Sequence, residues 1–172
     1  RNHGMDKTAS DRNSDGYSHW DMPVMGWKYN MSNIEAAFLL PQFDRLQQKL
    51  ESREELSRYY TNILKNIEGI RVPAQKIGSD SIHAHHVYPI WIDGGRRDDL
   101  ILYMQKNNIG VVVNYRPIHI MSYFKSTFGS TEGDFPIAEQ IGEETLSLPF
   151  YPDMPAKYID QVCEKLMDFV NK

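Results

Sequence analysis

The sequence predicts an α/β fold in which helices cover a small sheet. Two observations carry this prediction. Apolar residues recur near the helical period over residues 34–67, which is typical of long amphipathic helices. Beyond residue 87, short apolar runs of strand length alternate with further helical patterns. Strands that alternate with helices indicate a layered arrangement, because each apolar helix face has to be buried against a sheet.

Residues 1–25 are rich in Asp, Asn, Ser, Gly and His and contain few aliphatic side chains. Such a segment buries little apolar surface, so we expect an extended or poorly ordered loop. A helix start follows it. Ser32 and Glu35 have the spacing of a capping box, in which each side chain accepts a hydrogen bond from the other residue's backbone N–H. We therefore expect a rigid turn directly before a helix.

Pro41 interrupts the helical pattern that follows. Since proline lacks an N–H donor and its ring clashes with the preceding turn, we expect a break or kink at Leu39–Pro41 and two helices in place of one. On the solvent face of the second helix, Glu54 and Arg58 are placed to form an i,i+4 ion pair. The apolar positions of the pattern are Ile34, Phe38, Leu40, Phe43, Leu46, Leu50, Leu56, Tyr60, Ile63 and Ile67.

Strands and a helix alternate in the middle of the chain. Short runs of β-branched and aromatic residues predict the strands, and an Asp-Gly-Gly turn bounds the first of them. In chain order, the expected elements are a strand at Val87–Ile92, a turn at 93–95, a helix at Asp98–Asn107 with Leu100, Ile101 and Met104 inward, and strands at Ile109–Val113 and Thr145–Leu148.

An amphipathic helix is expected from about Pro155 to the end of the chain. Pro155 suits the first turn, where its missing N–H costs nothing, and Asp153 is expected to cap the helix. The apolar face of this helix consists of Ile159, Val162, Leu166, Phe169 and Val170.

Composition narrows the class of protein. The 172 residues are 41% hydrophobic, which allows one sizeable core. The net charge of −4 gives no support for a nucleic-acid partner, because binding to a phosphate backbone depends on clustered Lys and Arg. No apolar run approaches the roughly 20 residues that a membrane-spanning helix needs. We therefore expect neither a nucleic-acid nor a membrane partner.

The single cysteine, Cys163, excludes an internal disulfide and indicates a reducing compartment, so we expect a cytoplasmic protein. Cys163 falls within the helical pattern near the end of the chain. In that position a buried, inert thiol is expected rather than a nucleophile.

The turn before the first helix carries groups that suit an anion. Lys28, Tyr29 and Asn30 supply an ammonium, a phenol and an amide beside the exposed N–H donors of a helix N-terminus, a combination that favours a phosphate. An ordinary capped loop would contain the same residue types. From the residues alone, both interpretations stay open.

A second candidate site is the segment NYRPIH, Asn114–His119, directly after an expected buried strand. It places Tyr115, Arg116 and His119 at a strand end, where α/β folds tend to present ligand-binding groups. Arg116 can grip a phosphate with two bonds, and His119 can donate to a sugar hydroxyl or a phosphate. The alternative is a surface loop with a satisfied histidine.

His83, His85 and His86 raise the question of a metal site. In a strand-like segment His83 and His85 share one face while His86 points away, and no carboxylate or cysteine stands at ligand spacing nearby. We expect no metal site, and instead a strand-edge cluster that packs or contacts substrate. The sequence also contains no Gly-rich phosphate loop, Cys/His pair or nucleophile elbow.

Several short motifs occur in order along the chain and together cover nearly all of it. They are HGMD at 3–6, GWKYNMSNIEAA at 26–37, QFDRL at 42–46, AHHVYPIWI at 84–92, NYRPIH at 114–119 and LSLPFYPDM at 146–154. This series resembles the downstream half of a DegT/StrS-type sugar aminotransferase. Enzymes of that family use pyridoxal phosphate and have the aspartate aminotransferase fold.

The resemblance implies a division of the chain at residue 42. Residues 43–172 would be the C-terminal small α/β domain, with long helices packed on a small sheet. Residues 1–42 would be a loop and a capped helix left over from the large, cofactor-binding domain. With that domain missing, the helix should expose apolar surface.

The family holds its cofactor as a Schiff base on a lysine, in a segment resembling SFHxxK, and nothing in this chain matches that segment. Lys7, the only lysine upstream of Lys28, follows the HG that in the family comes after the Schiff-base segment. We therefore expect a fragment that begins just past its catalytic lysine and is inactive alone. The alternative is a stand-alone, non-catalytic α/β binding module derived from such an enzyme.

The resemblance also implies roles for the two candidate sites. In the family the turn at Lys28 and Asn30 reaches the cofactor phosphate of the neighbouring subunit. Many members read NYRM where this chain reads KYNM, so either residue is a candidate for the contact. The residues expected to hold the substrate are Tyr115, Arg116, His119 and His86. Asn114 replaces a His that often precedes this Tyr, which leaves the sugar and nucleotide preference open.

The activity that the resemblance implies is transfer of an amino group, expected from glutamate, to the keto carbon of a nucleotide-linked deoxysugar. The expected cofactor is pyridoxal 5'-phosphate. The expected partners are the nucleotide sugar, the amino donor and a second copy of the chain, because the family builds its active sites between the subunits of a dimer.

Overall fold

The computed structural model describes residues 2–7, 19, 21–74 and 81–171. The chain forms two compact units, Arg1–Leu46 and Gln47–Lys172, and each is described by itself. Much of the loop expected over residues 1–25 lies outside the described residues. The assignment of residues 1–42 to a large domain and of residues 43–172 to a small one stays a prediction.

The first unit contains the short 3₁₀ helix η1, Asn2–Gly4, and the helix α2, Asn33–Phe43. The predicted capping box at the start of α2 is confirmed. Ser32 N–H donates to Glu35 Oε2 at 2.8 Å, and Glu35 N–H donates to Ser32 Oγ at 3.2 Å. Both donors are therefore satisfied without any residue from outside the first helical turn.

The helical pattern divides into two helices as predicted, but the predicted break at Leu39–Pro41 is wrong in position. Pro41 lies inside α2, and the turn between the helices comes at Asp44–Arg45. Bonds on both sides of the proline persist: Asp44 N–H donates to Leu40 O at 3.4 Å, and Arg45 Nε donates to Pro41 O at 3.1 Å. A proline near a helix end removes one backbone bond, and the neighbouring bonds complete the last turn.

None of the side chains of α2 is buried within the described residues. Ile34 is 72% exposed and Phe38 is 70% exposed. A run of exposed apolar side chains marks a surface that another protein surface covers, whereas single ones are ordinary. The predicted exposure of apolar surface is thus confirmed. The exposed apolar residues from α2 to residue 46 are Ile34, Phe38, Leu39, Leu40, Phe43 and Leu46.

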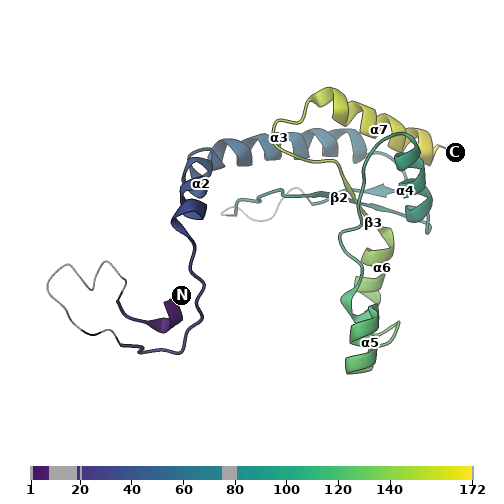
Figure 1. Ribbon diagram of the computed structural model, residues 1–172. Helices are drawn as coiled ribbons and strands as arrows, with labels where there is room; N and C mark the ends of the chain where they lie inside the picture. Colours follow the sequence, from purple (N-terminus) through teal and green to yellow (C-terminus); the bar gives the residue numbers. More distant parts are fainter. Residues whose placement is uncertain (1, 8–18, 20, 75–80, 172) are drawn as a thin grey trace. The chain divides into compact units, whose positions relative to one another are not determined.

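The second unit contains a three-stranded antiparallel sheet in the order β1-β2-β3 (Figure 1). The strands are β1, Ile70–Arg71; β2, Tyr88–Ile92; and β3, Thr145–Leu148. In the register of β2 with β3, Tyr88 pairs with Leu148 and Ile90 with Leu146. The predicted strands at 87–92 and 145–148 are confirmed to within one residue, whereas β1 was not predicted.

Three helices carry most of the apolar packing of the second unit: α3, Leu46–Leu64; α4, Arg97–Lys106; and α7, Ala156–Val170. Figure 1 shows α3 and α7 running alongside each other, and Tyr59 OH donates to Asp160 Oδ1 between them at 2.7 Å. The predicted helices at 98–107 and from about 155 are confirmed. The predicted ion pair on α3 is also present, with Arg58 Nε 3.4 Å from Glu54 Oε1.

The predicted cap of α7 is wrong. Pro155 is the N-cap residue, and no side chain caps the helix. Asp153 lies in the preceding turn with φ 61°, and its N–H donates to Ser52 Oγ on α3 at 3.0 Å. Asp153 thus stands two residues before the N-cap position, in a turn that this bond ties to α3.

The predicted strand at 109–113 is also wrong. Only Val112 pairs with β3, through an isolated bridge to Ser147. The next contact with β3 comes from a side chain, since Asn114 Nδ2 donates to Ser147 Oγ at 3.3 Å. The backbone ladder therefore ends after one pair.

Residues 118–144 contain elements for which the sequence analysis made no prediction. They are the 3₁₀ helix η2, Ile118–Ile120, and the helices α5, Ser122–Phe128, and α6, Pro136–Glu144. In the part of the chain that the structure describes, no helix is long and apolar enough to cross a membrane.

The core lies between the sheet and the helices α3, α4 and α7. Tyr88, Ile90 and Ile92 alternate along β2 and are all buried, as expected for a strand with one covered face. Tyr60 of α3 stacks on Tyr88 with ring centroids 4.8 Å apart, and Tyr88 OH shares a 2.7 Å hydrogen bond with Thr61 Oγ1. The predicted α/β arrangement of long helices on a small sheet is confirmed.

Cys163 of α7 is buried in this core, as predicted. Burial raises the pKa of its thiol to about 12, so the thiol is protonated at neutral pH. Because the thiolate is the reactive form, Cys163 is an inert core residue.

Glu35 provides a pH test of the capping box. Its bonds with Ser32, first to the backbone N–H and then to the hydroxyl, hold the pKa of the Glu35 carboxyl below its usual 4.5. A carboxyl with a lowered folded pKa contributes stability above its unfolded pKa, and that contribution is lost as pH falls through the folded value. We predict an NMR titration midpoint for Glu35 below 4.5. Ser32→Ala should move it only part of the way back, since the backbone donor remains, and an unshifted wild-type midpoint would contradict the capping box.

Candidate functional site

The turn at Lys28–Asn30 is held against η1 by its backbone. Asn2 N–H lies 2.8 Å from Lys28 O and 3.2 Å from Asn30 Oδ1. The close approach requires glycine, because a Cβ on Gly4 would lie 1.9 Å from Val24 O. The ammonium of Lys28 and the amide N–H₂ of Asn30 stay exposed, with no hydrogen bond or ion pair in the described residues. These two side chains present only donors outward.

The capping box fills part of the helix N-terminus beside this turn. The capping box occupies the N–H groups of Ser32 and Glu35, and it places the Glu35 carboxylate at the start of α2. A carboxylate in that position already complements the positive end of the helix dipole. The side chains of Lys28 and Asn30 add donors for an anion beside this N-terminus. A shallow depression of about 590 Å³ beside them is lined by Tyr29, Asn30, Met31, Glu35, Phe38 and Leu39.

The segment 114–119 forms one wall of an open pocket of about 730 Å³ in the second unit. Three predicted site residues meet there, Tyr115, Arg116 and His119, although no strand precedes them. Tyr115 is 73% exposed, and the Arg116 guanidinium has no hydrogen bond or ion pair in the described residues. The pocket is lined by Tyr115, Arg116, Pro117, Ile118, His119, Phe124, Phe128, Ser130, Phe135, Ala138 and Ile141.

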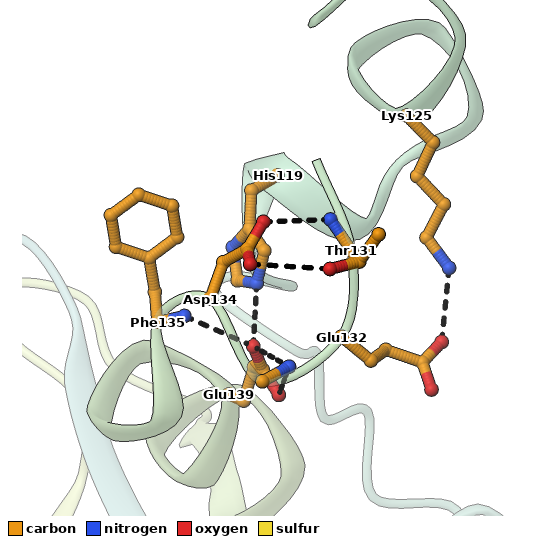
Figure 2. Close-up of polar contacts among 8 residues, drawn as sticks. His119, Lys125, Thr131, Glu132, Asp134, Phe135 and Glu139 are labelled. Atoms are coloured by element: carbon orange, nitrogen blue, oxygen red, sulfur yellow. Dashed lines mark hydrogen bonds and ion pairs between the residues drawn. The ribbon is translucent and has the colours of Figure 1, made fainter. Parts of the chain in front are cut away.

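His119 is engaged by a carboxylate that the sequence analysis did not single out. His119 Nε2 lies 2.7 Å from Glu139 Oε1 of α6, and its ring meets Phe135 edge-on with centroids 4.8 Å apart (Figure 2). Gly133 N–H also donates to Glu139 Oε1, at 2.9 Å. The hydrogen bond from His119, followed by those from the backbone, lowers the pKa of the Glu139 carboxyl.

Two further contacts anchor the loop that carries Arg116. Its start is tied to β3 by the bond from Asn114 to Ser147. Its middle packs against α6, where the absent side chain of Gly142 leaves room for Pro117: a Cβ on Gly142 would lie 2.4 Å from Pro117 Cδ. Together with the bond between His119 and Glu139, these contacts hold both ends of the loop.

The residues that sequence reasoning missed all belong to α5, α6 and the turn between them: Phe124, Phe128, Phe135, Glu139 and Gly142. One signal for α6 was present in the sequence. Pro136 stands at the first helical position, where its missing N–H costs nothing, and Ile137 and Ile141 follow at helical spacing. No local signal pairs Glu139 with His119.

The three histidines at 83–86 do not lie on a strand, in contrast to the strand-like segment expected. His85, with φ 42°, donates its N–H to His83 Nδ1 at 3.0 Å, and His85 Nε2 lies 2.6 Å from Glu54 Oε2. Burial, followed by the neighbouring histidines, lowers the pKa of His83. His86 is exposed and does not line the pocket of Arg116. Over the described residues, no three His, Cys, Asp or Glu side chains are grouped to hold a metal ion.

Comparison with protein families assigns nearly the whole chain. Residues 1–167 match the model of the DegT/DnrJ/EryC1/StrS aminotransferase family. The chain belongs to this family. The predicted family resemblance is confirmed, and pyridoxal phosphate is the cofactor of the family's full-length enzymes.

The chain is similar to known proteins in both sequence and structure. The spore coat polysaccharide biosynthesis protein SpsC of Bacillus subtilis is 36% identical over 98% of this chain and 44% of its own length. The UDP-4-amino-4-deoxy-L-arabinose–oxoglutarate aminotransferase of Shewanella sediminis is 28% identical over 98% of this chain and 45% of its own length. A putative sugar aminotransferase of Streptococcus pneumoniae, solved in its PMP form, superimposes with a TM-score of 0.82 at 23% identity, over 99% of this chain and 43% of its own.

The chain spans less than half the length of the proteins it matches. The structural likeness places it in the aspartate aminotransferase-like fold, as the sequence predicted. A sequence identity of 23% to a solved structure shows the fold alone. The roles of individual residues therefore have to be argued from the geometry of this chain.

The described residues fit the phosphate of the cofactor but not its lysine attachment. The exposed ammonium of Lys28 and the amide of Asn30 are donors of the kind that bind a phosphate. Among the described lysines none is buried, and the hydrogen bond to Asp168 raises the pKa of Lys165. A lysine that forms a Schiff base at neutral pH needs the opposite shift.

We predict that Gly142→Ala destabilises the chain. The new Cβ would overlap the rigid ring of Pro117, and the cost of overpacking exceeds the helix propensity gained, so the free energy of unfolding should fall by about 1 kcal/mol or more in urea denaturation. Gly110→Ala is the control, because a Cβ there meets no atom within 4 Å and the glycine has no positive φ. Equal effects of the two substitutions would contradict the tight contact with Pro117.

Proposed function

We propose that this chain is the C-terminal part of a pyridoxal-phosphate-dependent sugar aminotransferase. The observation that carries the proposal is the family match over residues 1–167, in a chain that spans less than half of its relatives. The full-length protein would transfer an amino group from glutamate to the keto carbon of a nucleotide-linked deoxysugar. It would act as a cytoplasmic homodimer, in which the exposed apolar face of α2 is covered.

In this proposal the residues of this chain bind the cofactor phosphate and the nucleotide sugar and orient them. Lys28 and Asn30 hold the cofactor phosphate of the neighbouring subunit through charge-assisted and amide hydrogen bonds. Arg116 binds an anionic oxygen of the nucleotide sugar, and Tyr115 and His119 line the same pocket. His86 lies outside this pocket, so in this proposal it would contact a part of the substrate that extends beyond it. The cofactor, when bound, supplies the electron sink for amino transfer, while the protein supplies geometry and charge.

Sugar amination is supported by the relatives. Among them are a UDP-4-amino-4-deoxy-L-arabinose–oxoglutarate aminotransferase and a spore coat polysaccharide biosynthesis protein. The donor that fits an oxoglutarate-linked reaction is glutamate. Full-length protein supplied with pyridoxal phosphate, glutamate and a nucleotide-linked 4-keto sugar should form 2-oxoglutarate and an amino sugar, detected by mass spectrometry. Absence of amination across UDP- and dTDP-linked 4-keto sugars would overturn the proposal.

The second candidate is a stand-alone, non-catalytic binding module. In this candidate the protein would carry no lysine segment of the SFHxxK type. The upstream coding sequence separates the two candidates. A reading frame that continues through a lysine segment favours the enzyme, and an in-frame start immediately before Arg1 favours the module.

We predict that this chain alone does not attach pyridoxal phosphate at one specific lysine. Reduction with borohydride should trap the cofactor only at low and scattered occupancy on surface lysines, because no described lysine is buried and activated. Peptide mapping by mass spectrometry measures the occupancy of each lysine. A stoichiometric adduct at Lys7 or Lys28 would contradict the proposed division of the site.

We predict that Lys28→Ala combined with Asn30→Ala weakens cofactor retention in the full-length protein by roughly tenfold or more. A charge-assisted hydrogen bond is worth about 1.5–3 kcal/mol and a neutral one about 1 kcal/mol. Equilibrium dialysis measures the affinity. The matched control is Asn62→Ala with Lys65→Ala, an exposed Asn on α3 and an exposed Lys directly after this helix, whose side chains share a 3.3 Å hydrogen bond.

A heterodimer separates a contact made in trans from one made in cis. The double variant is paired with a subunit that lacks the cofactor lysine, so that only the variant's own site carries a lysine. If the turn reaches into the neighbouring subunit's site, the partner supplies that site with an unaltered turn, and cofactor binding there should be normal. Weak binding there would show that Lys28 and Asn30 serve their own subunit.

A further inference from the structure

Glu139 connects His119 to the turn before α6 (Figure 2). Its carboxylate lies 2.7 Å from His119 Nε2, and it accepts the backbone N–H groups of Gly133 at 2.9 Å and Phe135 at 3.3 Å. The side chains of His119 and Glu139 are only 10% and 18% exposed. Since these bonds lower the pKa of Glu139, its carboxyl is ionised at neutral pH and can only accept. His119 Nε2 must therefore carry the proton.

In the neutral ring, this bond determines what the other nitrogen offers. In a neutral imidazole whose Nε2 carries the proton, Nδ1 has a free lone pair and acts as an acceptor. No hydrogen bond among the described residues uses His119 Nδ1, and Nδ1 is not one of the buried polar atoms that lack a partner. The atom is therefore not fully buried, on a residue that lines the pocket.

The pocket around His119 presents complementary polar groups. Arg116, three residues earlier on the same wall, supplies only donors, and its guanidinium is free of hydrogen bonds and ion pairs in the described residues. Aromatic side chains of Phe124, Phe128 and Phe135 make up much of the remaining lining. One acceptor and one cation beside apolar walls suit a ligand that combines hydroxyl groups with anionic oxygens.

We propose that Glu139 is a positioning residue, which orients His119 so that Nδ1 accepts a hydrogen bond from a sugar hydroxyl of a nucleotide sugar bound at Arg116. The identity of this ligand rests on the proposed function. The step from Glu139 to His119 rests on the observed hydrogen bonds. Glu139 itself does not touch the ligand.

The test uses the full-length protein with UDP-glucose and dTDP-glucose as probes in titration calorimetry. Glu139→Leu removes the acceptor and should weaken binding roughly three- to tenfold, the range for one lost hydrogen bond. Glu139→Gln keeps an acceptor oxygen and should restore most of the affinity. Glu132→Leu is the matched control, because Glu132 lies in the turn before α6 and pairs with Lys125 at 2.9 Å, and this variant should bind as the wild type does.

A double-variant cycle separates positioning from a general role in holding the turn. In a His119→Ala background, Glu139→Leu should cost less than twofold more, because Glu139 acts through the missing ring. An equal loss in both backgrounds would overturn the proposal. If Glu139→Leu does not fold, the ¹⁵N shifts of His119 in the wild-type protein decide. A neutral ring protonated at Nε2 supports the proposal, and a ring protonated at Nδ1 or at both nitrogens overturns it.

Failure of this inference and failure of the proposed function give different results. A protein that binds the probes with the expected coupling but does not aminate any keto sugar retains the positioning role and refutes the aminotransferase. A protein that aminates a keto sugar but shows no coupling between Glu139 and His119 supports the aminotransferase and refutes the positioning role. If neither probe binds at millimolar concentration, the role of His119 toward a nucleotide sugar is overturned.

Discussion

The pairing of β2 with β3 is the constraint on which the second unit depends. Its register places Tyr88 and Ile90 on the face that the long helices bury, with Leu146 of β3 opposite Ile90. Because side chains alternate along a strand, a slip of one residue would move this apolar set to the other face. The same strand also sets the position of the pocket. Ser147, on the alternate face of β3, holds Val112 by backbone pairing and Asn114 by a side-chain bond.

The two candidate sites are held in different ways, and this affects what each can do. The turn at Lys28–Asn30 is fixed through its backbone and a glycine contact, so its donor side chains extend freely from a rigid base. That arrangement suits a contact with a separate subunit. The loop that carries Arg116 is fixed through side chains at both ends, by Ser147 and by Glu139. A loop ordered before the ligand arrives binds without paying the entropy of ordering.

The parts that sequence reasoning predicted correctly depend on residues close together in the chain. The capping box needs only Ser32 and Glu35, and the buried state of Cys163 follows from the helical period of its neighbours. Two of the errors lie where the chain makes a distant contact. Asp153 lies in a turn bound to Ser52 of α3 and not at the N-cap of α7, and the contact with β3 that follows Val112 is a side-chain bond from Asn114 to Ser147.

The sequence by itself determined the family, the α/β class, the rigid turn at Lys28–Asn30 and the presence of Arg116 and His119 in one short segment, because cap spacing, periodicity and ordered motifs are local properties of a chain. Only the tertiary structure decided the partner of His119. Glu139 lies 20 residues further along, on a helix that docks through the contact between Gly142 and Pro117. Hydrogen bonds and close packing across such separations depend on how whole helices meet the sheet, and no local pattern encodes that meeting.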